Sequence, residues 1–200
     1  MKIFLTSHAG RVIDRIIPKL PKKPEELKAL FITTAGNPYT DIHWINEDRE
    51  NLTKAGFALT DYDLVDKTED EVKKAVDDND VIFVEGGNTF YLLKYARESG
   101  FDKVMREQKA SDKIYIGVSA GAYIATPTVE PTTWKRKKET YGITDLTGLG
   151  LVPFAIFPHY SDEYKDLVET RKKELKYDLV TIRDDEVIEA KKNGAEKLEL

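Results

Sequence analysis

The sequence K-I-Y-I-G-V-S-A-G-A-Y-I-A-T (residues 113–126) predicts a strand, a tight turn and the start of a helix. An apolar, β-favouring run ends at Gly117, Ser119 follows, and small residues open the helix. The segment G-V-S-A-G fits the G-x-S-x-G nucleophile elbow, in which small neighbours permit a sharp turn that exposes the serine hydroxyl. The Ala120 amide would then lie at a helix N-terminus, where it can stabilise an oxyanion. A serine hydrolase is therefore the first hypothesis.

The composition indicates one globular domain covering residues 1–200, because 40% of the residues are hydrophobic and 34% are charged. The net charge is −5 and no long basic tract occurs, so nucleic acid is not an expected partner. No apolar run approaches the about 20 residues that cross a bilayer, and the N-terminus lacks a signal-peptide pattern. We expect a cytoplasmic protein with no membrane partner. The lack of cysteine excludes disulfides, thiolate zinc sites and a cysteine nucleophile.

Strands and helices alternate along the chain, which predicts an α/β fold with a mostly parallel sheet covered by helices on both faces. Strands are expected at residues 2–6, 28–33, 59–65, 81–85, 114–116 and 153–157, and helices at 12–20, 42–55, 68–78, 90–97, 101–111 and 162–176. Short strands at 180–183, 187–190 and 197–200 are expected to close the chain as a meander around a turn at Asn193-Gly194.

The carboxyl ends of parallel strands form the sites in such sheets, so residues that follow strands should meet at one edge. Ser119 needs a base, and the chain has three histidines. His159 is the best candidate, because it follows a predicted strand and comes after the serine, as in elbow hydrolases. His8 could also reach this edge, whereas His43 lies in a predicted helix, where a surface or packing role is expected. The Gly87 amide is either a second oxyanion donor or part of an ordinary tight turn.

Three segments in this order resemble peptidase family S51: V-E-G-G-N-T-F-Y-L-L (84–93), Y-I-G-V-S-A-G-A-Y-I-A-T-P (115–127) and G-L-G-L-V-P-F-A-I-F-P-H-Y (148–160). This family includes dipeptidase E, an aspartyl dipeptidase, and cyanophycinase. The resemblance implies a three-layer α/β/α sandwich like that of class I glutamine amidotransferases, and a Ser-His-acid peptidase that needs no metal or other cofactor. It implies Ser119 as nucleophile, His159 as base, and Gly87 with Ala120 as oxyanion hole. It also implies hydrolysis after an N-terminal aspartate in small peptides.

The acid of the triad is where this sequence departs from the family. The family places the acid after the serine, in a window that here reads W-K-R-K (134–137) and holds no carboxylate. We select Glu139, just beyond that window, as the acid. The alternative is that Glu139 is a solvated charge beside Lys137 and Lys138.

Substrate contacts are expected from Asn88, which follows the two glycines, and from Arg171. Arg171 matches an arginine of dipeptidase E and would hold a carboxylate, or it is an ordinary surface arginine. Glu85 would either oppose an acidic substrate or hold a substrate amine.

The sequence therefore predicts a serine exopeptidase or dipeptidase that acts on small peptides through an acyl-enzyme. One alternative is a catalytically silent relative that binds a small peptide or amino-acid-like ligand, which the basic stretch in place of an acid would favour. Another is a different acyl hydrolase, such as an esterase. The oligomeric state is left open, with a homodimer among the options.

Overall fold

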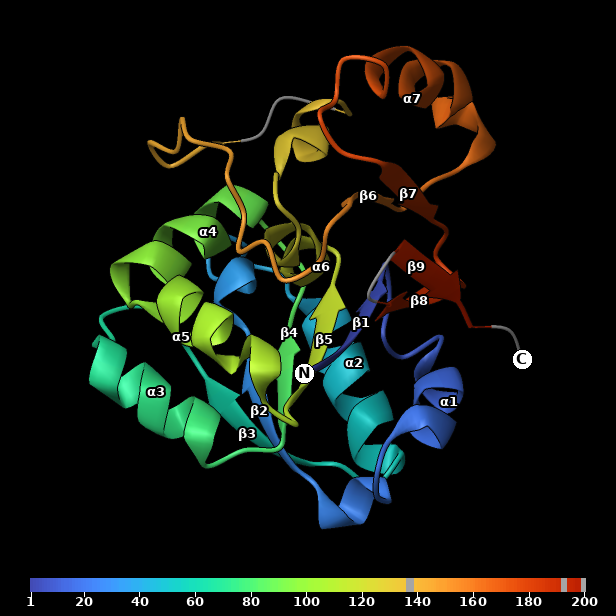
Figure 1. Cartoon of the computed structure of the whole chain (residues 1–200). Helices are drawn as coiled ribbons and strands as arrows, with labels where there is room; N and C mark the ends of the chain where they lie inside the picture. Colours follow the sequence, from blue (N-terminus) through green and yellow to red (C-terminus); the bar gives the residue numbers. More distant parts are fainter. Residues whose placement is uncertain (136–138, 192–193, 199–200) are drawn as a thin grey trace.

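The computed structural model describes residues 1–135, 139–191 and 194–198. Its centre is a seven-stranded sheet in the order β3-β2-β4-β5-β1-β8-β9 (Figure 1). The strands are β1 (Lys2–Thr6), β2 (Lys28–Ile32), β3 (Ala58–Tyr62), β4 (Val81–Val84), β5 (Ile114–Val118), β8 (Val187–Lys191) and β9 (Gly194–Lys197). β1 to β5 are parallel, whereas β8 and β9 are antiparallel to their neighbours. The predicted α/β class with a mostly parallel sheet is confirmed.

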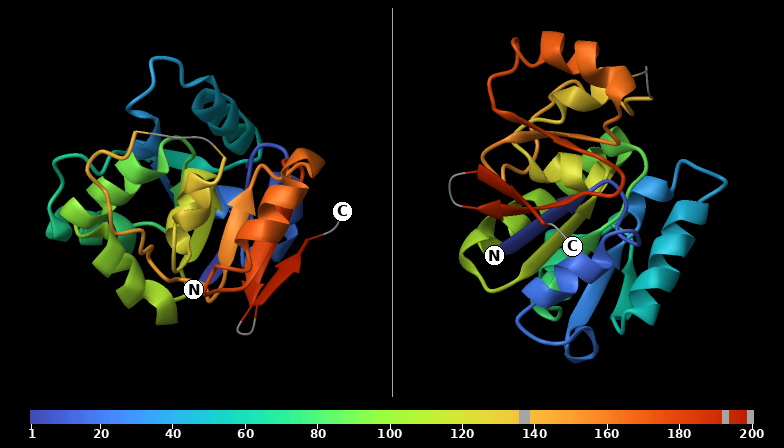
Figure 2. Two further views of the ribbon diagram at one scale, coloured as in Figure 1. Left: turned by 90° about the horizontal axis from the view of Figure 1, so that it is seen from above. Right: turned by 90° about the vertical axis from the view of Figure 1, so that its right-hand side faces the viewer.

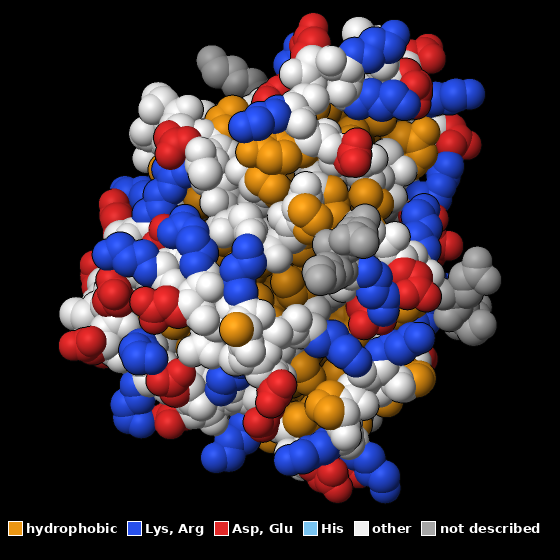
Figure 3. All heavy atoms as spheres, in the orientation of Figure 1, with side chains coloured by type: hydrophobic (Ala, Val, Ile, Leu, Met, Phe, Trp, Pro, Cys, Tyr) orange, Lys and Arg blue, Asp and Glu red, His pale blue; other side chains and the backbone are white. Residues whose placement is uncertain are grey.

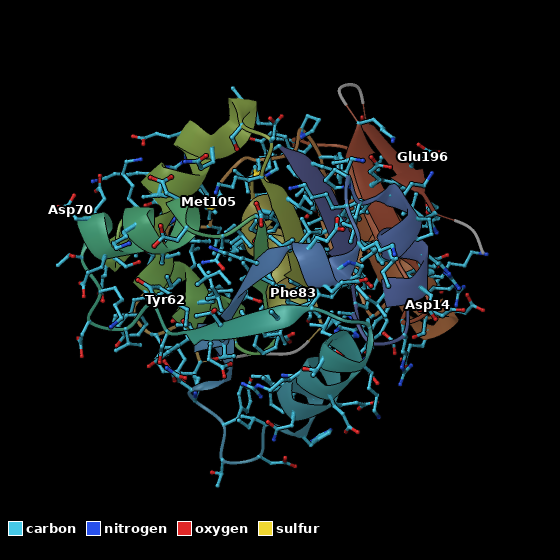
Figure 4. All side chains as sticks on the ribbon, turned by 90° about the horizontal axis from the view of Figure 1, so that it is seen from below. Asp14, Tyr62, Asp70, Phe83, Met105 and Glu196 are labelled. Atoms are coloured by element: carbon cyan, nitrogen blue, oxygen red, sulfur yellow. The ribbon has the colours of Figure 1, made fainter. Side chains whose placement is uncertain are left out.

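Helices cover both faces of this sheet, as Figures 1 and 2 show. One face carries α1 (Ile13–Ile16) and α2 (His43–Lys54), and the other carries α3 (Glu69–Asp77), α4 (Thr89–Glu98), α5 (Phe101–Glu107) and α6 (Ala120–Ala125). Side chains that alternate along each strand serve the two cores in turn. In β4, Phe83 belongs to the core cluster that includes Ile13 of α1 and Leu52 of α2, whereas Val84 belongs to the cluster that includes Met105 of α5. Figure 4 labels Phe83 and Met105, which serve the two different cores. The predicted layered sandwich follows from this alternation.

Local sequence accounts for where several helices begin. Thr68 and Glu71 form a capping box before α3, because the Glu71 amide donates to the Thr68 hydroxyl and the Thr68 amide donates to the Glu71 carboxylate at 2.9 Å. The predicted helix at 12–20 instead divides into α1 and a 3₁₀ turn at Ile17–Lys19. Pro18 lies in that turn and has no amide to continue an α-helix.

The predicted meander at the C-terminal end is wrong in part. β6 (Ala155–Pro158) and β7 (Leu179–Ile182) form a separate parallel pair, and only β8 and β9 form a hairpin. Parallel strands need a long crossover, which the chain supplies through α7 (Lys165–Arg171), shorter than the predicted helix at 162–176. Asn193 of the predicted turn, and residues 199–200 of the last predicted strand, lie outside the described residues.

The surface carries charges of both signs. Figure 3 shows Lys and Arg side chains interspersed with Asp and Glu on the face over α3 to α5. In the part of the chain that the structure describes, no helix is long and apolar enough to span a bilayer.

Gly121 packs α6 directly against β4. A Cβ at Gly121 would lie 2.1 Å from the Val84 carbonyl oxygen, which belongs to the backbone and cannot rotate away. We expect Gly121→Ala to lower the free energy of unfolding by about 3 kcal/mol in urea denaturation, although helix propensity favours alanine by up to about 1 kcal/mol. The control is Gly142→Ala, where nothing lies within 4 Å and only the positive φ of 80° opposes the change. That variant should lose about 1 kcal/mol, and equal losses would contradict the packing argument.

Candidate active site

Ser119 lies at the apex of a strand-turn-helix elbow between β5 and α6. Its φ of 46° and ψ of −99° fall outside the regions that non-glycine residues usually occupy. The turn is held because the Ser119 amide donates to the Thr6 carbonyl at 2.9 Å and the Tyr123 amide donates to the Ser119 carbonyl at 2.9 Å. It is also compact, since a Cβ at Gly117 would lie 2.7 Å from the Gly121 carbonyl oxygen. The predicted elbow is present in the structure.

His159 reaches Ser119 from the smaller sheet. It follows β6, and its Nε2 lies 2.9 Å from the Ser119 Oγ. Its backbone is fixed from two sides: the His159 amide donates to the Ser7 hydroxyl at 2.8 Å, and the Lys135 Nζ donates to the carbonyls of Pro158 and His159 at 2.7 and 2.9 Å. Ser119 and His159, predicted from the sequence to act together, are therefore in hydrogen-bond contact.

The carboxylate at the far side of the imidazole is Asp184, not Glu139. The His159 Nδ1 lies 2.7 Å from the Asp184 Oδ1. Glu139 instead accepts a hydrogen bond from the Tyr141 amide at 3.2 Å, so its selection as the partner of His159 is corrected. The cause is strand register: Pro158 of β6 pairs with Ile182 of β7, so the residues just after the two strands meet.

Electrostatics favour a neutral imidazole beside an ionised carboxylate. Burial lowers the pKa of His159 to about 4, against the opposing effect of Asp184. Partial burial pushes the pKa of Asp184 upward, but the hydrogen bond and charge of His159, with His8 and Arg11, outweigh it and lower that pKa. Because the carboxylate can only accept, Nδ1 carries the proton and Nε2 is free to accept the Ser119 proton.

The two predicted oxyanion donors lie near Ser119: Gly87 lines both cavities that Ser119 lines, and Ala120 is the next residue in the chain. Gly87 has a φ of 146°, and a Cβ there would lie 2.1 Å from the Ala35 carbonyl oxygen, so only glycine fits. Ala120 is the first residue of α6, and its amide therefore has no acceptor within the helix.

Two cavities open at the Ser119-His159 pair. The smaller, of about 260 Å³, is lined by residues that include Trp44, Asp48 and Gly87. The larger, of about 450 Å³, shares Trp44 and Gly87 and adds Tyr39, Lys135 and Tyr164. Hollows of about 490 and 580 Å³ lie beside Met1, at the opposite end of β1 from the elbow, and hold no comparable pair. The arrangement offers space on two sides of one serine.

Asp48 lines the smaller cavity, and Glu85 contacts Gly86, another residue of its lining. Asp48 is 5% exposed and accepts hydrogen bonds from the amides of Gly10 at 2.8 Å and Ala9 at 3.3 Å, and burial raises its pKa. Glu85 is fully buried; its Oε2 accepts from the Gly86 amide, and its Oε1 has no hydrogen-bond partner among the described residues. Burial, with the nearby Asp48, raises the pKa of Glu85 well above its usual value. Asp48 is therefore the carboxyl group that lines this cavity, with Glu85 buried behind Gly86.

Neither predicted substrate residue, Asn88 or Arg171, is among the residues that line the two cavities. Asn88 is buried beside Gly87, caps α4 by accepting from the Phe90 amide at 2.9 Å, and donates to the Glu139 carbonyl at 3.2 Å. Arg171 lies at the end of α7, 5.9 Å from the Trp134 ring, and lines neither cavity at Ser119. The basic side chain that lines one of them is Lys135.

The sequence contains features that point to Asp184 and Lys135 as residues of the site. Asp184 follows a strand that itself follows the histidine, and the order Ser, His, acid satisfies the same rule about strand ends. Lys135 belongs to the basic window in which an acid was expected, and Arg136 and Lys137 of that window lie outside the described residues.

Comparisons with known proteins agree with this geometry. The model of peptidase family S51 matches residues 3–198. An uncharacterised peptidase of Listeria innocua serovar 6a is 30% identical over 96% of this chain and 97% of its own length. Peptidase E of Salmonella typhimurium is 33% identical over 76% of this chain and 64% of its own length. The crystal structure of a peptidase E candidate from Listeria monocytogenes has a TM-score of 0.87 at 27% identity, over 100% of this chain and 98% of that one.

Proposed function

Because the chain belongs to peptidase family S51 and is therefore a serine peptidase, we propose that it is an exopeptidase that hydrolyses short peptides, above all dipeptides, through an acyl-enzyme on Ser119. The observation that carries the proposal is the unbroken chain of contacts from the Ser119 Oγ to His159 at 2.9 Å and from His159 to Asp184 at 2.7 Å. Its position between two small cavities supports the restriction to short substrates.

In the proposed reaction each group acts from the position that it has in the structure. The Ser119 Oγ attacks the peptide carbonyl while the His159 Nε2 takes its proton, and Asp184 stabilises the imidazolium that forms. The amides of Gly87 and Ala120 stabilise the oxyanion of the tetrahedral intermediate. His159 then gives the proton to the leaving amine, and water, activated by the same imidazole, releases the acyl group.

Charge on the two sides of Ser119 supports a dipeptide as the substrate. A dipeptide carries an ammonium group at one end and a carboxylate at the other, a few ångströms from the bond that breaks. Asp48 lines the smaller cavity and Lys135 lines the larger one, so each end of a dipeptide would meet an opposite charge. In this proposal the amino end binds on the Asp48 side and the carboxyl end on the Lys135 side.

The charges around Ser119 also bear on which N-terminal residue the substrate carries. The family resemblance implies an N-terminal aspartate, but Asp48 lines the smaller cavity and Arg171 lines neither cavity. A second carboxylate beside Asp48 would be repelled. We therefore propose that neutral N-terminal residues are better substrates than aspartate.

A panel of peptides tests the proposal. Ala-Ala should be hydrolysed faster than Asp-Ala, and both faster than a hexapeptide. N-acetylation or C-terminal amidation of Ala-Ala should each lower kcat/KM by about tenfold or more, since a hydrogen bond to a charged group contributes about 1.5–3 kcal/mol. Hydrolysis of p-nitrophenyl acetate with no cleavage of any peptide would favour an esterase. No hydrolysis and no labelling by a fluorophosphonate would favour a silent relative.

A further inference from the structure

One histidine beside the site has no part in the proposed reaction. His8 follows β1, and its Nε2 lies 3.8 Å from the Asp184 Oδ2, while its ring lies 5.0 Å from that of His159 at an angle of 75°. Potential ligand atoms of His8, His159 and Asp184 all lie within 4.8 Å of one another. We propose that these three residues form a zinc-binding site, and that zinc bound there switches the peptidase off.

The donor set fits zinc. Two imidazoles and one carboxylate, with water in the fourth position, form a three-ligand zinc site of a known kind. With bonds of about 2.0–2.2 Å, tetrahedral ligand atoms lie about 3.4 Å apart. The His8 Nε2 lies 3.8 Å from the Asp184 Oδ2 and the His159 Nδ1 lies 2.7 Å from the Asp184 Oδ1, so the two contacts lie on either side of that value, and a zinc ion bound there would require rotation of these side chains. Magnesium and calcium prefer oxygen ligands and fit this set poorly.

The site is open to a metal ion. The side chains of His8, His159 and Asp184 are 31%, 35% and 45% exposed, so an ion can enter without unfolding. Among the described residues, two cations oppose a metal here: Arg11, whose Nη1 lies 3.9 Å from the Asp184 Oδ2, and Lys135, whose Nζ donates to the His159 carbonyl at 2.9 Å. Arg11 is 58% exposed and can move into water, although its presence makes the site weaker than a buried structural zinc site.

Zinc would stop catalysis by reversing the imidazole tautomer, a step that rests on the proposed function, whereas zinc binding itself does not. The Nε2 of His159 faces Ser119, so the nitrogen available on the Asp184 side is Nδ1. A metal at Nδ1 takes the lone pair of that nitrogen, and the single proton of the neutral ring moves to Nε2. The protonated Nε2 donates to the Ser119 Oγ and cannot accept its proton. No net proton is gained or lost, and the peptidase without zinc remains the active form.

The test compares zinc binding with the rate of Ser119 labelling. Zinc affinity is measured on the full chain by competition with a chromophoric chelator, and labelling by a fluorophosphonate is timed with zinc and after EDTA. Wild type should bind one zinc per chain, and zinc should lower its labelling rate at least tenfold, with recovery in EDTA. His8→Gln should bind zinc about 100-fold more weakly, because even groups one step removed from a metal contribute 10–100-fold to affinity. Each variant is compared with its own zinc-free rate.

His43→Gln is the matched control, because His43 also lines the smaller cavity but lies outside the cluster. It should keep the zinc affinity and the zinc inhibition of wild type. Equal zinc affinity in wild type and His8→Gln, or active enzyme that binds no zinc, would overturn the inference. Zinc binding that depends on His8 in a chain with no labelling and no hydrolysis would instead retain the site and overturn the proposed function.

Discussion

Ser119→Ala is expected to hydrolyse Ala-Ala about 10⁶-fold more slowly than wild type, the loss that removal of a triad nucleophile produces. The hydroxyl of Ser119 is the group that would form the acyl-enzyme, and it lies 2.9 Å from the imidazole that would take its proton. The variant should also lose all covalent labelling by a fluorophosphonate. Both effects are measured on protein whose free energy of unfolding in urea matches that of wild type.

Ser161→Ala is the control for this experiment. Ser161 lies two residues after His159, but it is partly exposed and its hydroxyl donates to the Glu163 carboxylate. The control should keep its kcat/KM within about twofold of wild type, as surface substitutions usually do, and should be labelled normally. Labelling that survives in Ser119→Ala would assign the nucleophile to another residue.

Asp184→Asn is expected to lower kcat about 10⁴-fold with a much smaller effect on KM. An amide at this position can present its NH₂ group to His159, which favours the tautomer that carries the proton on Nε2 and cannot act as a base. Steady-state kinetics on Ala-Ala measure the change. Asp184 is only partly buried, so the variant should fold normally.

Glu139→Gln separates the structural assignment from the one made on sequence. Glu139 contacts the Tyr141 amide rather than the imidazole, so this variant should keep kcat within about twofold of wild type. A large loss of kcat in Glu139→Gln together with a small loss in Asp184→Asn would identify Glu139 as the acid of the triad.

Features encoded in short contiguous segments were predictable from the sequence. The elbow at Ser119 depends on a few neighbouring residues, and the capping box before α3 depends on Thr68 and Glu71. The alternation of strands and helices was enough to place Gly87, Ser119 and His159 at the same edge. In each case the physical cause is local backbone geometry or the rule that parallel strands end together.

Features that depend on which strands pair were not predictable in the same way. Short apolar runs near the C-terminus indicate strands but do not specify their partners, so the pairing of β7 with β6 was missed. Asp184 was missed for the same reason, because it meets His159 only through that pairing. Arg171 was expected at the substrate from its position in the family pattern, but α7 places it against Trp134.

Ser119 and His159 come from different sheets, which are joined at the site by the hydrogen bond from the His159 amide to the Ser7 hydroxyl, just after β1. β5 and α6 support Ser119 within the large sheet, whereas β6, β7 and the ammonium group of Lys135 support His159. The contact between the Ser119 hydroxyl and the His159 imidazole therefore depends on how the two sheets pack against each other. Substitutions that shift one sheet slightly against the other would change the Ser119–His159 contact, and with it the catalytic rate, at little cost in the stability of the whole protein.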